Sequence, residues 1–323
     1  MNVLTYREWS ETCTSLHLVL QMMGKTKLAA MVPQPEWGHV VLLLEPDGFS
    51  TGLVSTESGE FEVRLSVESA EVHAASSSGL RASFSLGEAA STSERYRRFQ
   101  EMLDQIGHPL PIDPMPQEMS IATPFDKMVD RAPFDTESAR KALRQFLFAH
   151  NALGRFSSAF RGKRTPPSLY WGTFDLTTTL FSGEPLPFDP AASIVERAAF
   201  DEELMEFGFW PGDERTDEPS FFALAYPFVD GEPPKRPAIR GARFDRDSGE
   251  FLLSLKEALR SDDPIDTVVR FCRDAFGSVM ARRPWSRLDW FASPLLVPEL
   301  ARSQSGSPSP FGAHGDGRSD TAR

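Results

Sequence analysis

The sequence predicts an α+β protein of two similar halves, each a helix, an antiparallel sheet and a closing helix, packed together. Three observations support this. Apolar and polar residues alternate in several short segments of both halves, which is typical of half-buried strands. A helical pattern precedes and follows each group of strands. Six prolines between residues 108 and 133 forbid a continuous helix near the middle of the chain.

The first half comprises residues 1–107 and begins with a helix expected from about Glu8 to Met23. Strands are expected at EFEVRLSVES (60–69), LRASFSL (80–86) and HVVLLLE (39–45), the last forming a hairpin through PDG with FSTGLVS. Ser91 and Glu94 have the spacing of a capping box, which predicts the start of the closing helix.

Residues 108–134 are predicted to be a Pro-rich linker, and the second half then extends over residues 135–301. Its expected elements are a helix from about Thr136 to Phe160, strand-like segments at 169–183 and 220–229, and a hairpin at 242–255. A closing helix follows, with Asp263 as its cap and Pro264 in its first turn. Residues 302–323 are too polar to bury much surface, so we expect a disordered tail.

Both halves repeat the same order of elements, and a Trp-Gly pair accompanies the first strand of each, at Trp37-Gly38 and Trp171-Gly172. A dipeptide recurs by chance, so the order of elements carries more weight. We interpret it as an internal duplication.

Composition excludes several classes of function. The net charge is −12, from 34 Lys and Arg against 46 Asp and Glu, which disfavours a nucleic-acid partner. The longest aliphatic run, residues 40–44, is far shorter than the roughly 20 residues of a membrane span. Cys13 and Cys272 cannot form a disulfide framework, and the N-terminus lacks a signal-peptide pattern, so a soluble, cytoplasmic protein is expected.

The segment SLHLVLQMMGKTKLAA (15–30) contains a Gly-Lys-Thr triplet like that of a phosphate-binding loop. Val19 stands where that motif requires its first glycine, so we reject a nucleotide loop. As a helix, the segment aligns His17, Gln21 and Lys25 on one line among apolar residues. Buried polar groups need partners, so this line faces either a polar network or a water-filled cleft.

Other candidate site residues are spread along the chain. His39 follows Trp37 near a strand, but no short-spacing pair of histidines supports a metal site, and we predict no metal ligands. The segment GFWPG (208–212) is expected to be a rigid turn that presents Trp210 as a wall for a flat ligand. The further candidates are Asp175 and Glu203 as acid/base groups and Tyr226 as a pocket residue.

The segments LHLVLQMMGKTKLA, EWGHVVLLLEPDGFSTG, WGTFDLTTTLFSG, GFWPGD and FFALAYPF, with the closing helix, resemble a bacterial domain-of-unknown-function family, DUF5996, over roughly residues 5–295. The resemblance implies that the line from His17 to Lys25 and the GFWPG segment are characteristic of the family. It implies no activity. The chain has Asp201-Glu202-Glu203 where the family pattern has Ser-His-Glu, which argues against a site built on two histidines.

These observations predict a small-molecule site in a cleft between the halves, with enzymatic activity left open. His17, Glu203 and Asp175 are the expected catalytic residues. The expected ligand-binding residues are Gln21, Lys25, Trp37, His39, Trp210 and Tyr226. The alternative is a non-catalytic interaction or structural protein in which the polar line only pins the halves together. The sequence indicates neither a cofactor nor an oligomeric state.

Overall fold

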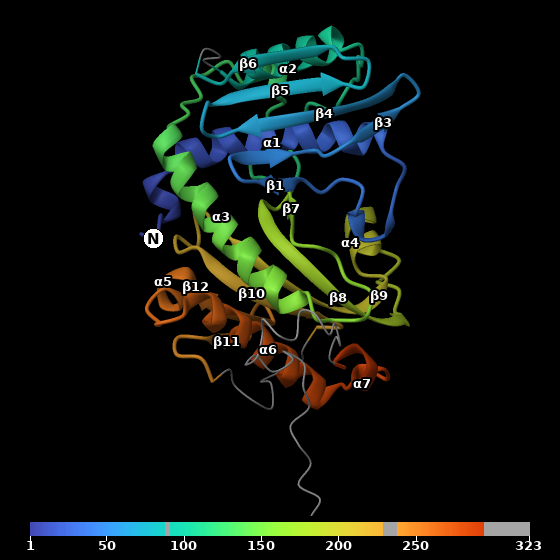
Figure 1. Cartoon of the computed structure of the whole chain (residues 1–323), viewed down its shortest axis with the longest axis vertical. Coiled ribbons are helices and arrows are strands. Elements are labelled where there is room, and N and C mark those ends of the chain that lie inside the picture. The colour runs from blue at the N-terminus through green and yellow to red at the C-terminus, as the bar shows by residue number, and fades with distance from the viewer. Residues whose placement is uncertain (88–90, 229–237, 294–323) are drawn as a thin grey trace, which may run out of the picture.

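The computed structural model describes residues 1–87, 91–228 and 238–293, and shows helices packed with two antiparallel sheets (Figure 1). The predicted α+β class is therefore confirmed. The expected tail at 302–323 lies outside the described residues. None of the helices in these ranges has the apolar length that a membrane span requires.

The first sheet has six strands in the order β1-β2-β4-β5-β6, and β3 pairs with β4. These strands are β1 (Leu43–Glu45), β2 (Gly48–Ser50), β3 (Val54–Thr56), β4 (Gly59–Ser66), β5 (Glu71–Ser76) and β6 (Arg81–Ser85). Phe61, Val63 and Leu65 of β4 are buried, while the intervening side chains are not, as the alternation predicts. The predicted hairpin exists but is shorter than expected, because residues 39–42 do not belong to a strand.

The first long helix, α1 (Ser10–Ala30), extends beyond the predicted end at Met23 and crosses the middle of the molecule (Figure 1). It includes the whole Gly24-Lys25-Thr26 triplet, so no phosphate-binding loop exists there. Every residue of the helix from Ser15 to Lys27 is buried. Short 3-10 helices precede and follow it, η1 (Tyr6–Glu8) and η2 (Pro35–Trp37).

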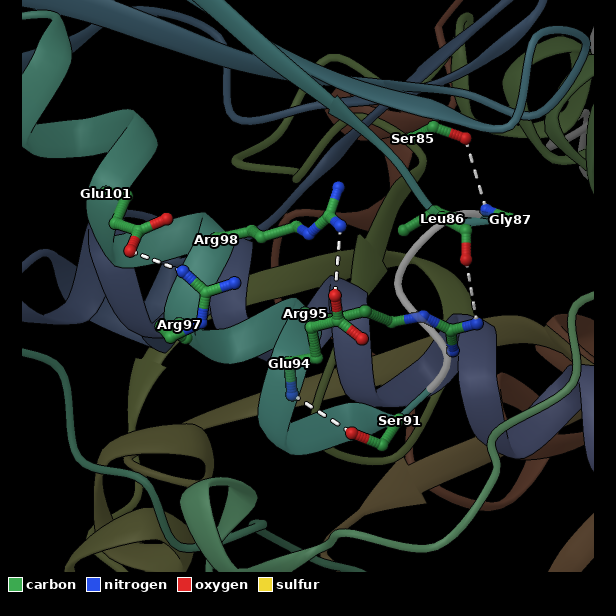
Figure 2. A network of polar contacts seen from close by, with 9 residues as sticks. All are labelled: Ser85, Leu86, Gly87, Ser91, Glu94, Arg95, Arg97, Arg98 and Glu101. Carbon is green, nitrogen blue, oxygen red and sulfur yellow. Dashed lines mark hydrogen bonds and ion pairs between the residues drawn. The ribbon is translucent and has the colours of Figure 1, made fainter.

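Helix α2 (Thr92–Gln105) closes the first half and begins at the predicted cap, since the Ser91 hydroxyl accepts a hydrogen bond from Glu94 N at 3.1 Å. Arg95 is only 2% exposed, and its guanidinium donates to the carbonyls of Leu86, at 3.1 Å, and Ala132, at 2.6 Å. Figure 2 shows the bond to Leu86 beside the capped end of the helix. Arg95 thus connects α2 to the end of β6 and to the Pro-rich segment.

The Pro-rich segment contains one short helix, η3 (Phe125–Lys127), and leads to α3 (Thr136–Ser157), which is capped by Asp135. The second sheet has six strands in the order β11-β12-β10-β9-β8-β7. They are β7 (Ser168–Tyr170), β8 (Asp175–Pro185), β9 (Glu202–Trp210), β10 (Ser220–Tyr226), β11 (Arg243–Asp245) and β12 (Glu250–Ser254). The short helix α4 (Ile194–Ala199) lies between β8 and β9.

Two helices cover one face of the second sheet. Helix α3 packs against β8 and β9, and α6 (Pro264–Arg282) packs against β10 and β12, so both lie on the same side (Figure 1). Asp263 caps α6 by accepting from Asp266 N, and Pro264 occupies its first turn, as predicted. The remaining short helices are α5 (Leu255–Ala258) and α7 (Leu288–Phe291).

One expected strand-like segment of the second half is divided, and one prediction was wrong. The segment 169–183 forms parts of β7 and β8, because Trp171 to Phe174 turn the chain between these strands. Residues 208–210 are not part of a turn but the end of β9, and the chain turns only after them. The Phe222 ring of β10 covers Gly208 and leaves no room for a side chain, because a Cβ at this strand position would come 2.2 Å from that ring.

Candidate functional site

The face of the second sheet that points away from α3 and α6 forms the floor of a hollow of about 1210 Å³. The alternation of the strands defines this face. In β9, Phe207 contacts Phe156 of α3 and Phe209 contacts Phe146 of α3. The alternate residues, Gly208 and Trp210, therefore point to the opposite face of the sheet. The floor residues are Asp175, Trp210, Ser220, Phe222, Glu250 and Leu252.

The walls of the hollow come from distant parts of the chain. One wall is the first half of α1, at Cys13, Thr14 and His17, and another is the Pro-rich segment at Glu118 to Ser120. The turn after β7 and the loop at 212–216 complete the rim. The hollow therefore lies where α1 meets the second sheet.

His17 is 8% exposed and its two ring nitrogens have different surroundings. Nε2 lies 2.7 Å from the carbonyl of Trp171 and 3.1 Å from that of Gly172. A carbonyl only accepts hydrogen bonds, so Nε2 carries the proton and Nδ1 has a free lone pair. Within the described residues Nδ1 has no hydrogen-bond partner, and the ring lines the hollow.

Burial also keeps this imidazole neutral. It lowers the pKa of His17 to about 4, against the smaller opposing effect of the two carbonyls. The ring stacks on Phe174, with centroids 4.7 Å apart and planes within 15°. His17 therefore presents a rigid, uncharged hydrogen-bond acceptor to the hollow at neutral pH.

Asp175 begins β8 on the floor of the hollow and is 8% exposed. Its carboxylate accepts a hydrogen bond from the Thr173 hydroxyl. Burial raises the pKa of Asp175 to about 6, opposed by the Thr173 bond and increased by the nearby charges of Glu118 and Glu250. A carboxyl group with this pKa exchanges protons readily near neutral pH.

Three further carboxylates belong to this region and were missed from the sequence. Burial raises the pKa of Glu206 to about 8, with Asp175 and Glu250 adding to the effect. Burial also raises the pKa of Glu118 and of Glu250. The positions 206, 208 and 210 share one face of β9, so reading this segment as a strand would have placed Glu206 beside the floor.

Cys13 lines the hollow but has no nucleophilic character. Burial raises its pKa to about 12, so it remains a thiol at neutral pH.

The other two residues of the helical line do not border the hollow. Gln21 is fully buried; its amide nitrogen donates to the Gln117 carbonyl at 2.7 Å, and its oxygen accepts from Gln117 N at 2.8 Å. Lys25 lies 3.6 Å from the Asp113 carboxylate and 5.8 Å from the centre of the Trp171 ring. These two residues therefore hold α1 against the Pro-rich segment and the turn after β7.

Trp37 and His39 lie away from the hollow and stack on each other with centroids 5.7 Å apart. The Trp37 indole donates to the Val195 carbonyl at 3.0 Å, and His39 Nδ1 accepts from Gln34 N at 3.1 Å. His17 and His39 thus have separate partners. In the described part of the chain, no group of three or more His, Cys, Asp or Glu side chains could hold a metal ion.

Glu203 and Tyr226 lie at the opposite end of the second sheet. Glu203 precedes Trp210 by seven positions along the extended β9, which amounts to about 23 Å at roughly 3.3 Å per residue. The Tyr226 hydroxyl donates to the Leu186 carbonyl, and its ring packs in a separate aromatic cluster. The structure therefore brings together His17, Asp175 and Trp210 from the predicted set, and separates Glu203 and Tyr226 from them.

A comparison with protein families matches residues 1–290 to a family of unknown function, DUF5996, in agreement with the expected resemblance. Neither the curated proteins nor the solved structures contain a match to the chain. The chemistry of the hollow therefore has to be inferred from its own residues.

Proposed function

Because this chain belongs to the DUF5996 family, whose function is unknown, we propose from its geometry that it binds a small molecule in the hollow between α1 and the second sheet. The ring of His17 is the observation that carries this proposal. Its Nε2 contacts two backbone carbonyls, whereas its Nδ1 has no hydrogen-bond partner within the described residues and the side chain lines the hollow. An acceptor kept in this state is suited to a ligand that donates a hydrogen bond.

The hollow also contains groups for proton transfer. Asp175 shares the hollow with His17, and its raised pKa suits it to give or take a proton from a bound molecule. The aromatic rings of Trp210, on the floor, and Phe174, on the rim, would exclude water from one side of the ligand. If the ligand reacts, we assign the proton-transfer role to Asp175 and a positioning role to His17.

The hydrogen bonds of Gln21 favour the second candidate, a protein in which the polar line only pins its parts together. Both ends of the Gln21 amide bind the backbone of Gln117, and His17 Nε2 binds the turn after β7. These bonds explain why Gln21 and Nε2 of His17 are buried polar groups in α1. They leave the second nitrogen of His17 and the carboxylates on the sheet unexplained, so we prefer the binding function.

A thermal-shift screen against metabolites distinguishes the binding function from the structural alternative, since a ligand that binds only the folded state raises the melting temperature. At a ligand concentration of about 100 Kd, the stabilisation is about 2.7 kcal/mol. We expect at least one compound to stabilise the wild type, and its effect to be lost in Asp175→Asn and Trp210→Ala. Glu60→Gln, at an exposed position of β4, is the control and should keep the effect. A screen without a stabilising compound, or shifts that Asp175→Asn leaves unchanged, would contradict the proposal.

We also propose a cytoplasmic location and an internal duplication. The two cysteines are unpaired and buried, which suits a reducing compartment. Each half contains a six-stranded antiparallel sheet preceded by a long helix, which supports a common origin. The strand orders of the two sheets differ, so the duplicated halves would have diverged in topology as well as in sequence.

A further inference from the structure

The charges around the hollow indicate which class of ligand it takes, an inference that rests on the proposed binding function. Carboxylates far outnumber cationic side chains among the lining residues. Within the described part of the chain, Arg215 and Arg243 are the only Lys or Arg side chains that line the hollow. A ligand with a net negative charge would therefore meet strong repulsion there.

The two guanidiniums do not neutralise the floor. Arg243 is paired with Asp245 at 2.6 Å, and Arg215 lies exposed on the rim loop. Among the described residues, no ion pair involves Glu118, Asp175 or Glu250. These three carboxylates therefore have no ion-pair partner within the described residues.

The carboxylates of the hollow influence one another electrostatically. Glu118 and Glu250 both raise the pKa of Asp175, in addition to its burial. These groups come from the Pro-rich segment, β8 and β12, so the fold brings them to one hollow although the chain separates them widely. The Glu118 carboxylate lies against Gly172, whose carbonyl contacts His17. A bound cation would relieve this repulsion.

His17 supplies an independent observation that points to the same ligand. Its Nδ1 can only accept a hydrogen bond, so it selects a ligand with an N–H or O–H donor. The aromatic rings of Trp210, Phe174 and Phe222 also border the hollow, and ring faces attract organic cations. A metal ion matches this lining less well, because no group of three ligating side chains converges among the described residues.

We propose that the hollow binds a small protonated amine, with its ammonium group between Glu118 and Asp175 and an N–H donated to Nδ1 of His17. The aliphatic part of the amine then lies against Trp210 and Phe222. A protonated amine provides both the positive charge that the floor lacks and the donor that His17 requires.

Isothermal titration calorimetry on the intact protein at neutral pH tests this with three probes of equal chain length: cadaverine, the corresponding pentane diol, and glutarate. We expect cadaverine to bind at least about tenfold more tightly than the diol, and glutarate not to bind. Asp175→Asn and Glu118→Gln should each weaken cadaverine binding by about tenfold, whereas Glu60→Gln should not change it. Binding should also release protons, seen as heats that depend on the ionisation enthalpy of the buffer.

Equal affinities for cadaverine and the diol, or tighter binding of glutarate, would overturn the amine assignment. So would a stabilisation by Ca²⁺ or Mg²⁺ alone that cadaverine does not compete with. A neutral or anionic compound that stabilises the wild type but not Asp175→Asn would leave the binding function standing and remove only the amine class. Absence of any ligand in both experiments would contradict both proposals.

Discussion

His17 and Asp175 show how burial determines the chemistry of single residues in this protein. Burial removes the positive charge from His17 and makes it a neutral acceptor, with a pKa near 4. The same effect favours the protonated form of Asp175, whose pKa rises to about 6. The pKa of each group therefore differs from its value in water, because the charged form of a buried group loses its hydration.

The raised pKa of Asp175 makes stability depend on pH. The folded protein holds this proton more tightly than the unfolded chain, whose pKa is near the ordinary value of 3.8. The free energy of unfolding should therefore fall as the pH rises from about 4 to about 6, by an amount on the order of 1–3 kcal/mol. Asp175→Asn should reduce this fall, and urea unfolding across that pH range measures it. Parallel profiles for the wild type and the variant would show that Asp175 is not responsible, and Glu60→Gln serves as the control.

At the scale of elements, α1 is buried on nearly all sides because its neighbours approach its backbone closely. Gly24 allows the closest approach, since a Cβ at this position would lie 2.1 Å from the indole of Trp171. That indole also donates to the Val40 carbonyl at 3.0 Å, so it cannot move aside freely. The glycine of the Gly-Lys-Thr triplet therefore has a packing role and no role in phosphate binding.

Gly24→Ala should destabilise the protein by about 1–3 kcal/mol, because the added methyl group overlaps a fixed indole. Gly277→Ala is a matched control in α6, where an added Cβ would meet no atom within 4 Å. That substitution should be neutral or stabilising by up to about 1 kcal/mol, since alanine favours a helix. Chemical denaturation of the two variants measures the difference, and equal stabilities would refute the packing role of Gly24.

At the scale of the whole molecule, contacts between distant segments connect the two sheets. Leu42 and Leu169 form an antiparallel bridge between the segment before β1 and strand β7. Gln21 binds the Pro-rich segment through both ends of its amide. Near the N-terminus, Leu4 N donates to Gln145 of α3 at 2.7 Å. The first half, the Pro-rich segment and the second half are therefore joined by hydrogen bonds.

This dependence predicts a single unfolding transition. Circular dichroism and tryptophan fluorescence should report the same denaturation midpoint, because neither half can lose its structure without exposing the other. Gln21→Leu should lower that midpoint, at a cost of about 1–3 kcal/mol for the unpaired backbone groups of Gln117, without separating the two signals. Two distinct midpoints in the wild type would show that the halves fold independently.

The starts of helices α2 and α6 were predicted correctly, because their capping residues lie next to them in the sequence. The caps at Ser91 and Asp263 form the expected hydrogen bonds, because a cap acts within one turn of its own helix. Strand β9 was missed because its burial depends on β8 and β10, which flank it, and its glycine suggested a turn. That error placed Glu203 near Trp210, although the extended strand separates them.

The sequence by itself determined the α+β class, most helices and hairpins, and the unusual polar line on an apolar helix, because periodicity and capping are local properties. It left open whether that line was paired or faced a cleft. Only the tertiary structure decided this, and both answers hold. Gln21, Lys25 and Nε2 of His17 have partners, while the His17 side chain also lines the hollow. The carboxylates around it come from β8, β12 and the Pro-rich segment, and their proximity depends on strand pairing across long stretches of chain, which no local pattern encodes.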